Sequence, residues 1–260
     1  MENKGQITIF VILGIVIIAL VVLVVMFRGE IYTPATSGNL NSKMNEVKRE
    51  LSNCLLDVGE EYVTRIGLQG GYLTPPSGSY RLWNDTTISY LCYKQEGKRT
   101  CINRMLTEKE MEDQLAKAIE EAFPTCDFDL EDIKPEGVIK SYTVDLPTQP
   151  PKFKVDVAQS AVFVEMEYPI TFESESGGES VSEDKFTAKI DAPLGELYGV
   201  SQDILDAETT IGMFDVLTYV LSKTGRYTIY PSKPYPDKIY QIKLREGDYF
   251  FQFAVEGEAS

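Results

Sequence analysis

The stretch Gln6–Phe27, QITIFVILGIVIIALVVLVVMF, is the segment around which the rest of the chain is arranged. It runs for about 20 residues without a charged side chain, which is the length that an α-helix needs to cross the ~30 Å hydrocarbon core of a bilayer. A cleavable secretory signal has a shorter apolar region and a small-residue cleavage site, and neither feature is present here. The sequence therefore predicts a membrane-spanning helix over residues 6–28 that stays attached to the mature protein.

The residues just before this helix resemble a known signal. Lys4-Gly5-Gln6, followed at once by the apolar run, is similar to the class III signal peptide of archaeal type IV pilin-like proteins. In that family a short charged leader ends in glycine, and a leader peptidase cuts on the cytoplasmic side of the helix. The resemblance therefore implies a leader over residues 1–5 and a processing site between Gly5 and Gln6.

The chain departs from the family pattern at one position. The family has glutamate at the fifth mature residue, where this sequence has Phe10. That carboxylate is associated with subunit assembly, so the resemblance leaves assembly into filaments open. Ile7-Thr8-Ile9-Phe10 is similar to a variant found in membrane-anchored archaeal surface proteins, and residues 67–72 extend the resemblance only weakly.

Composition excludes several partners and chemistries. The chain has 25 Lys and Arg against 40 Asp and Glu, for a net charge of −15, and it has no histidine. Nucleic acid is not an expected partner, because phosphate binding needs a basic surface. Without histidine, Ser-His-Asp, Cys-His and His-zinc sites are excluded. The sequence predicts no cofactor, and the residues after the helix suffice for one large or two modest domains.

Four cysteines follow the membrane helix. They lack the paired C-x₂₋₄-C spacing of structural zinc sites, so two disulfides are expected in an oxidising compartment. Three pairings are possible. Residues 96–98 favour a hairpin turn between two of the cysteines, so we favour Cys92 with Cys101 and Cys54 with Cys126.

The expected orientation places the domain outside the cell. Lys4 gives the leading side of the helix a slight positive bias. Disulfides and the sequon Asn84-Asp85-Thr86, an N-glycosylation acceptor, also fit an exposed extracellular domain. We therefore expect a single-pass cell-membrane protein with a cytoplasmic N-terminus, and an exposed loop at Asn84.

The first part of the outer domain reads as helical. Residues 29–38 contain proline and glycine and predict a hinge, after which apolar side chains recur at steps of three and four. This stripe predicts a long helix with Asn39 as N-cap and Gly67 as its end. A capping box at Thr107 and Glu110 predicts a second helix that ends at Pro124. The expected stripe is Leu40, Met44, Val47, Leu51, Leu55, Val58, Tyr62 and Ile66.

Two segments of this part have alternative interpretations. Aromatic residues Tyr80, Trp83 and Tyr90 lie in a region without regular periodicity, and we expect a small satellite core there in preference to a carbohydrate-stacking surface. Residues 126–137 carry alternating carboxylates, but they lack the EF-hand spacing. A solvated acidic turn is therefore expected in preference to a calcium site.

The second part reads as strand-rich. Apolar residues occupy every second position from Val162 to Phe172, which predicts a strand with Pro169 at an edge or bulge. A polar loop over residues 174–184 leads into a returning strand. Ser201 is expected to cap a helix that ends at Gly225, and two strands with a turn at residues 245–248 close the chain. The side chains expected to point inward from the helix are Ile204, Ala207, Ile211, Phe214, Leu217 and Leu221.

These patterns predict an α+β fold. We expect an antiparallel sheet of about five or six strands packed with two or three amphipathic helices, in a helical, disulfide-stapled part (residues 39–134) and a β-rich part (residues 135–260) of one ectodomain, with a split near residue 135 as the alternative.

The expected function is that of a non-enzymatic, pilin-like cell-surface protein in adhesion, envelope structure or filament assembly, whose partners are the lipid bilayer, the leader peptidase, copies of itself or other envelope proteins. The alternative is a ligand-binding or sensory ectodomain that does not self-assemble. A hydrolase with a carboxylate dyad is a third hypothesis, and no sequence signature supports it.

Overall fold

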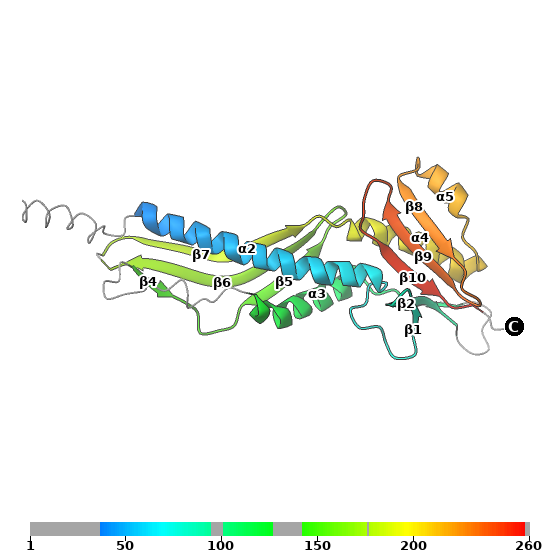
Figure 1. Cartoon of the computed structure of the whole chain (residues 1–260), viewed down its shortest axis with the longest axis horizontal. Coiled ribbons are helices and arrows are strands. Elements are labelled where there is room, and N and C mark those ends of the chain that lie inside the picture. The colour runs from blue at the N-terminus through cyan, green and yellow to red at the C-terminus, as the bar shows by residue number, and fades with distance from the viewer. Residues whose placement is uncertain (1–36, 95–100, 127–141, 176, 258–260) are drawn as a thin grey trace, which may run out of the picture.

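Helix α2 (Ser37–Leu68) is the longest element and runs along most of the molecule (Figure 1). The computed structural model describes residues 37–94, 101–126, 142–175 and 177–257. At ~1.5 Å per residue, the 32 residues of α2 extend for about 48 Å. The described residues form an α+β fold with four helices and two sheets in which most strand pairs are antiparallel.

The apolar stripe of α2 is buried as the sequence predicted, with one drift. The fully buried side chains are Leu40, Met44, Val47, Leu51, Leu55, Val63 and Ile66. Val58 and Tyr62 are only partly buried, and Val63 is buried instead. Along its length, α2 packs first against one sheet and then against the other, so the buried face shifts around the helix axis.

The ends of α2 differ from the expected ends. Ser37 and Gly38, placed in the hinge by the sequence, belong to the helix, and Gly67 lies inside its last turn. The chain leaves the helix at Gly70 and Gly71, whose φ angles are +72° and +85°. Glycine adopts this left-handed backbone without steric cost, which is why the chain turns there.

A four-stranded sheet packs along α2 and forms, with α3 (Glu108–Ala122), the unit that we call the shaft. Both helices cover the same sheet and also pack against each other, with α2 over β7 and β6 and α3 over β5. All pairings are antiparallel: β7 lines one side of β6, and β4 and β5 line the other. The strands are β4 (Tyr142–Asp145), β5 (Lys152–Val157), β6 (Val162–Ser174) and β7 (Ser180–Ile190).

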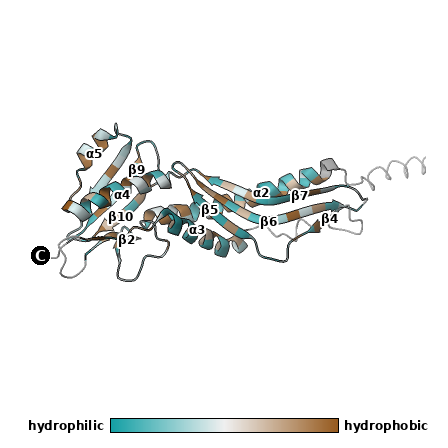
Figure 2. Cartoon of the chain, turned by 180° about the vertical axis from the view of Figure 1, so that it is seen from behind, coloured by the Kyte–Doolittle hydropathy of each residue, from teal (hydrophilic) through white to brown (hydrophobic). Residues whose placement is uncertain are grey.

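Strand β6 confirms the alternating pattern of the sequence. Its side chains are buried at every second position from Val162 to Phe172, and the alternation of apolar and polar residues along the shaft strands is visible in Figure 2. Pro169 lies at a bulge, because the β6–β7 register shifts between Glu167 and Ile170. On the other side of β6, Pro169 lies between the stretch paired with β5, which ends at Glu167, and the stretch paired with β4, which begins at Thr171. The expectation of an edge or a bulge at Pro169 is therefore confirmed. The turn after β6 is shorter than expected, since β7 already begins at Ser180.

A six-stranded sheet forms the second unit, which we call the head. Its strand order is β1-β2-β10-β9-β8, with β3 also paired to β2. Strands β2 and β10 run parallel, and the other pairs are antiparallel. The strands are β1 (Tyr80–Trp83), β2 (Thr86–Tyr93), β3 (Ile102–Asn103), β8 (Tyr227–Ser232), β9 (Lys238–Leu244) and β10 (Phe251–Val255).

The strand pairing corrects the expected division of the chain. The part expected to be helical, residues 39–134, contributes β1, β2 and β3 to the head, where β2 pairs with the last strand of the chain. The two units therefore do not separate near residue 135, and there are two sheets in place of one. This pairing joins residues about 160 positions apart, so no local pattern could indicate it.

The prediction for the third helix of the ectodomain is also corrected by the structure. Helix α4 (Leu194–Ile211) begins before Ser201, whose hydroxyl is buried and donates to the carbonyl oxygen of Leu197 at 2.8 Å. Gly212, with φ +76°, ends α4. A separate helix, α5 (Val216–Ser222), then begins with Asp215 as its N-cap. The prediction of one continuous helix that ends at Gly225 is therefore wrong.

Two smaller expectations are confirmed. The side chain of Thr107 and that of Glu110 form the capping box of α3. Trp83 and Tyr90 pack against a second apolar cluster of Ile88, Ile239 and Ala254, as expected for a satellite core, whereas Tyr80 is exposed and does not belong to it.

The predicted leader, membrane helix and most of the hinge (residues 1–36) lie outside the described residues, and so does nearly all of the acidic segment at 126–137. Within the ranges that the structure describes, no helix combines the length and apolarity needed to cross a membrane.

Gly67 provides a test of how α2 meets the head. On helix propensity alone, Gly→Ala stabilises a helix by up to about 1 kcal/mol. A Cβ at position 67 would lie 2.5 Å from the backbone oxygen of Phe250 and 2.5 Å from the hydroxyl of Tyr249. We expect Gly67→Ala to lower the free energy of unfolding by about 1–3 kcal/mol in urea titrations. Gly199→Ala in α4 is the control, because its Cβ meets no atom within 4 Å; it should be neutral or stabilising. Stabilisation by Gly67→Ala would contradict the packing.

Candidate functional site

A groove lies where the shaft meets the head. It has a volume of about 520 Å³ and is formed by the last turns of α2, the segment after β7 and the turn before β10. We call it the waist groove. Its lining residues are Leu56, Glu60, Val63, Thr64, Leu68, Lys189, Ile190, Asp191, Ala192, Asp248, Tyr249 and Phe250.

The waist groove combines an apolar floor with a charged rim. The groove lining contains three carboxylates, Glu60, Asp191 and Asp248, and one ammonium group, that of Lys189. The Nζ of Lys189 lies 2.6 Å from Asp191, and both side chains are mostly exposed. The rim is therefore net negative, so it suits a small molecule that carries a positive charge and an apolar body.

Tyr249 is the only tyrosine of the groove lining, and its hydroxyl is already used. It donates to the carbonyl oxygen of Val63 at 2.8 Å. Burial raises the pKa of Tyr249 well above the usual range of tyrosine. The hydroxyl therefore fixes the turn before β10 against α2, and it is not available as a general acid or base at neutral pH.

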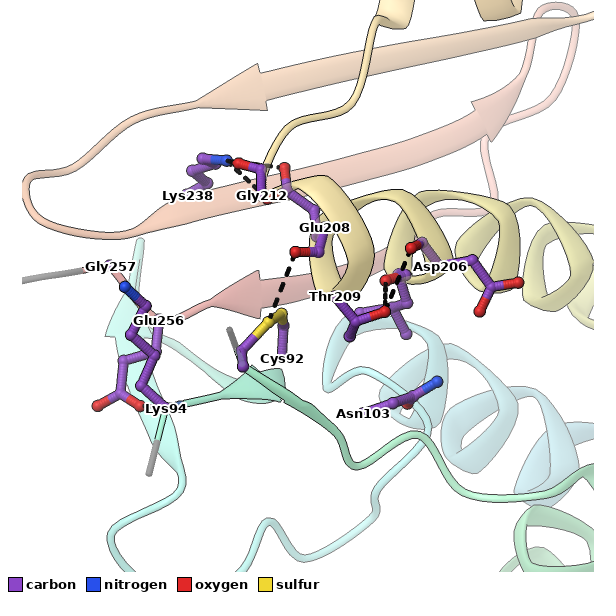
Figure 3. Close-up of a disulfide and its surroundings, with 12 residues drawn as sticks. Cys92, Lys94, Asn103, Asp206, Glu208, Thr209, Gly212, Lys238, Glu256 and Gly257 are labelled. Carbon is purple, nitrogen blue, oxygen red and sulfur yellow. Dashed lines mark hydrogen bonds and ion pairs between the residues drawn. A yellow bond between two sulfur atoms is a disulfide. The ribbon is translucent and has the colours of Figure 1, made fainter. Parts of the chain in front are cut away.

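A buried ion pair lies in the head, next to a disulfide (Figure 3). Lys238 on β9 donates to both carboxylate oxygens of Glu208, at 2.8 and 2.6 Å, and to the carbonyl oxygen of Gly212 at 2.8 Å. Tyr240 also donates to Glu208, and burial with this hydrogen bond raises the pKa of Tyr240. Because every charged group is paired, this cluster fastens the end of α4 to β9 and has no free acceptor for a ligand.

A second buried carboxylate joins the two sides of the head sheet. Asp237 is 4% exposed and accepts hydrogen bonds from Arg81, from the hydroxyl of Tyr90 at 2.7 Å and from the backbone N–H of Gly257 at 2.9 Å. Burial, assisted by the hydrogen bond to Asp237, raises the pKa of Tyr90 to about 12. Asp237 therefore holds the β1–β2 hairpin against β9, and its role is structural.

The four cysteines form the pairs that the sequence favoured. Cys54 pairs with Cys126 with 5.9 Å between Cα atoms, and Cys92 pairs with Cys101 with 5.2 Å between Cα atoms. The first disulfide fastens α2 to the end of α3, and the second closes β2 onto β3. The first closes the longer loop, so the chain-entropy model assigns it the larger stabilisation, about 4 kcal/mol against about 3 kcal/mol.

The other site residues that the sequence predicted do not line the waist groove. Asn84 and Asp85 form the two-residue turn between β1 and β2, where both have positive φ angles. Asn84 is exposed, as the sequon predicted. Gly5 and Gln6 lie outside the described residues. In the part of the chain that the structure describes, no set of three or more Cys, Asp or Glu side chains could hold a metal ion.

Sequence reasoning missed the buried carboxylates and the groove. Glu208 had a detectable signal, because it continues the series Leu197, Ser201, Ile204 and Leu205 on the buried face of α4. Asp237 and the waist groove had none, because their parts come from segments distant in the sequence. A comparison of the chain with protein-family models, curated proteins and solved structures finds no match to any of them.

Partly buried tyrosines with raised pKa values predict loss of stability at alkaline pH. The pKa of Tyr90 and that of Tyr227 rise to about 12, above the value of ~10 in the unfolded chain. Between these values the unfolded state loses the proton first, so the free energy of unfolding falls as pH rises from about 10 to about 12. We expect Tyr90→Phe to make this fall shallower in urea titrations at a series of pH values. Equal slopes for Tyr90→Phe and the unsubstituted protein would contradict the assignment.

Proposed function

We propose that this chain is a non-enzymatic, membrane-anchored cell-surface protein in which the shaft holds the head away from the bilayer. The carrying observation is the position of α2: it begins at the end of the shaft that is remote from the head (Figure 1). The membrane-spanning helix predicted over residues 6–28 precedes α2 in the sequence. With α2 extending for about 48 Å, the head stands beyond the reach of lipid headgroups.

Rigidity at the junction supports a spacer role. The side chain of Gln252 on β10 donates to the carbonyl oxygen of Leu68 at 2.8 Å, and Tyr249 donates to Val63. Both acceptors lie in the last turns of α2, so one helix is shared by the shaft and the head. A continuous helix transmits orientation across the junction, and a flexible linker would not.

The disulfides support an extracellular location. The two disulfides fit an oxidising compartment. Among the described residues, the buried carboxylates Glu208 and Asp237 are both paired. The resemblance to pilin-like proteins, in which a helix after the anchor supports a sheet, suggests adhesion, envelope structure or filament assembly as the role.

The leader processing that this proposal includes has a direct test. Intact-mass and N-terminal peptide measurements on the protein from its native membrane should show a chain that begins at Gln6. Gly5→Leu should abolish the cleavage, because the bulky side chain blocks the peptidase site, while Lys4→Arg should be processed normally. The same spectra would show whether Asn84 carries a glycan. A mature chain that begins at Met1 or Glu2 would contradict the pilin-like leader.

A ligand-binding or sensory ectodomain is the second candidate, and the waist groove favours it. The groove is large enough for a small organic molecule, and its rim selects positive charge. Because it lies between shaft and head, a bound molecule would contact both units at once.

A panel of amphipathic amines tests this candidate by thermal shift. We expect one or more amines to raise the unfolding temperature of the full-length chain, by stabilising the folded state through binding. Asp191→Asn with Asp248→Asn should remove at least half of the shift, whereas Asp145→Asn on β4, away from the groove, should retain it. An equal shift in both variants would indicate nonspecific binding to an acidic protein and would remove this candidate.

A further inference from the structure

The turn that joins β1 to β2 combines an unused amide with an aromatic neighbour. Asn84 and Asp85 are its two central residues, and their φ angles of +47° and +60° are those of a type I′ turn. This turn holds the sequon Asn84-Asp85-Thr86 at the edge of the head sheet, because β1 is the last strand on that side. Asn84 is exposed, and among the described residues none forms a hydrogen bond with its side-chain amide. The amide nitrogen is therefore open to the attachment of a sugar.

Trp83 is the residue that precedes Asn84 in the chain. It pairs with Thr86 across the two strands, so Trp83 and Thr86 lie on the same face of the hairpin. Trp83 packs against the small apolar cluster around Ile88, but it is only half-buried there. Part of the indole therefore stays open to solvent beside the sequon.

An open indole next to a sequon suits a sugar that is tethered to the asparagine. The C–H groups on one face of a sugar ring carry partial positive charge, and the face of an aromatic ring is negative. A free oligosaccharide would need several aromatic side chains on one surface, but Tyr80 lies on the opposite face of β1, and the hydroxyl of Tyr90 is bonded to Asp237. A single indole suffices for a tethered sugar, because the covalent bond gives it a high effective concentration.

We propose that Asn84 carries an N-linked glycan whose first sugar packs on the open part of Trp83 and thereby stabilises the β1–β2 hairpin. This inference rests on the extracellular location in the proposed function, because the sequon is an acceptor in secreted and surface chains. The hairpin belongs to the head, at the end of the molecule that is remote from the start of α2 (Figure 1). A glycan there would face the surroundings of the cell.

The attachment needs a glycosyltransferase and a lipid-linked sugar phosphate as the donor. The bond between C1 of the first sugar and the phosphate oxygen of the donor breaks, and the lipid phosphate leaves with the electron pair. A bond forms between C1 and Nδ2 of Asn84, whose amide gives up one proton to a base of the transferase. The side-chain amide keeps its second proton, and no oxidant or reductant takes part.

Peptide mass mapping of the full-length protein from its native membrane tests the attachment. After reduction, trypsin releases residues 82–94, and we expect this peptide to carry the mass of a glycan. Thr86→Ser should keep the glycan, because serine also completes the sequon, whereas Thr86→Ala should lose it although Asn84 is unchanged.

Labelling of intact cells with a membrane-impermeant amine reagent separates this inference from the proposed function. An unmodified peptide in a chain whose head is labelled would overturn the glycan and leave the proposed location intact. An unmodified peptide in a chain whose head escapes the reagent would overturn both.

Intrinsic fluorescence tests the packing, because Trp83 is the only tryptophan of the chain. Thr86→Ser and Thr86→Ala both lack the threonine methyl group, so they form a matched pair with and without the glycan. We expect the acrylamide quenching constant of Thr86→Ser to be at least twofold lower, because the sugar covers the indole. Adding Trp83→Phe and Tyr80→Trp to both moves the tryptophan to the opposite face of β1, where the two constants should be equal. Equal constants with Trp83 in place would overturn the packing.

Thermal unfolding of the same pair tests the stabilisation. Thr86→Ser should unfold about 2–4 °C above Thr86→Ala, the shift that one aromatic contact gives in a domain of this length. Adding Trp83→Leu to both should remove most of this difference, whereas adding Tyr80→Leu should retain it, because Tyr80 is 46% exposed on the opposite face of β1. A difference that survives Trp83→Leu would come from the Thr86 hydroxyl or from the bulk of the glycan, and it would overturn the role of Trp83.

Discussion

The burial of one face of α2 is the constraint on which the rest of the structure depends. Its apolar side chains from Leu40 to Ile66 all belong to one continuous core with the shaft sheet, α3 and the head strands. Among the described elements, α2 makes by far the most extensive contacts with both sheets. A change in the face that α2 buries would therefore displace the shaft sheet at one end and β10 at the other.

Close approach and buried polar bonds make this arrangement unique. Gly59 lets α2 approach β7 so closely that a Cβ there would lie 2.6 Å from the side chain of Ile190. In the head, Asp237 accepts hydrogen bonds from three chain segments, and Glu208 of α4 accepts hydrogen bonds from two residues of β9. Apolar burial supplies most of the stabilisation, whereas these polar bonds fix which segments meet, because an unpaired buried carboxylate is strongly disfavoured.

The two units divide the proposed work of a surface protein. In the proposed function, the acidic shaft is the spacer that keeps the head apart from the membrane. The waist groove lies between the shaft and the head and is lined by the last turns of α2, which both units share.

The sequence by itself determined the elements with strong periodicity. The stripe of α2, the capping box of α3 and the alternation of β6 were all readable, because each depends on neighbours within a few residues. The favoured disulfides also followed, from a candidate turn and a helix end. Periodicity gave no means to separate α4 from α5, since Ile211, Leu217 and Leu221 extend an apolar pattern that the structure leaves exposed.

Only the tertiary structure decided which strands share a sheet and which surfaces stay uncovered. The parallel pairing of β2 with β10, the contacts of Asp237 and the waist groove each join segments far apart in the sequence. A local pattern reports whether a side chain prefers burial, but not the element against which it is buried. That choice is made by the whole fold, because it depends on the shape and hydrogen-bonding groups of surfaces that exist only after the chain has folded.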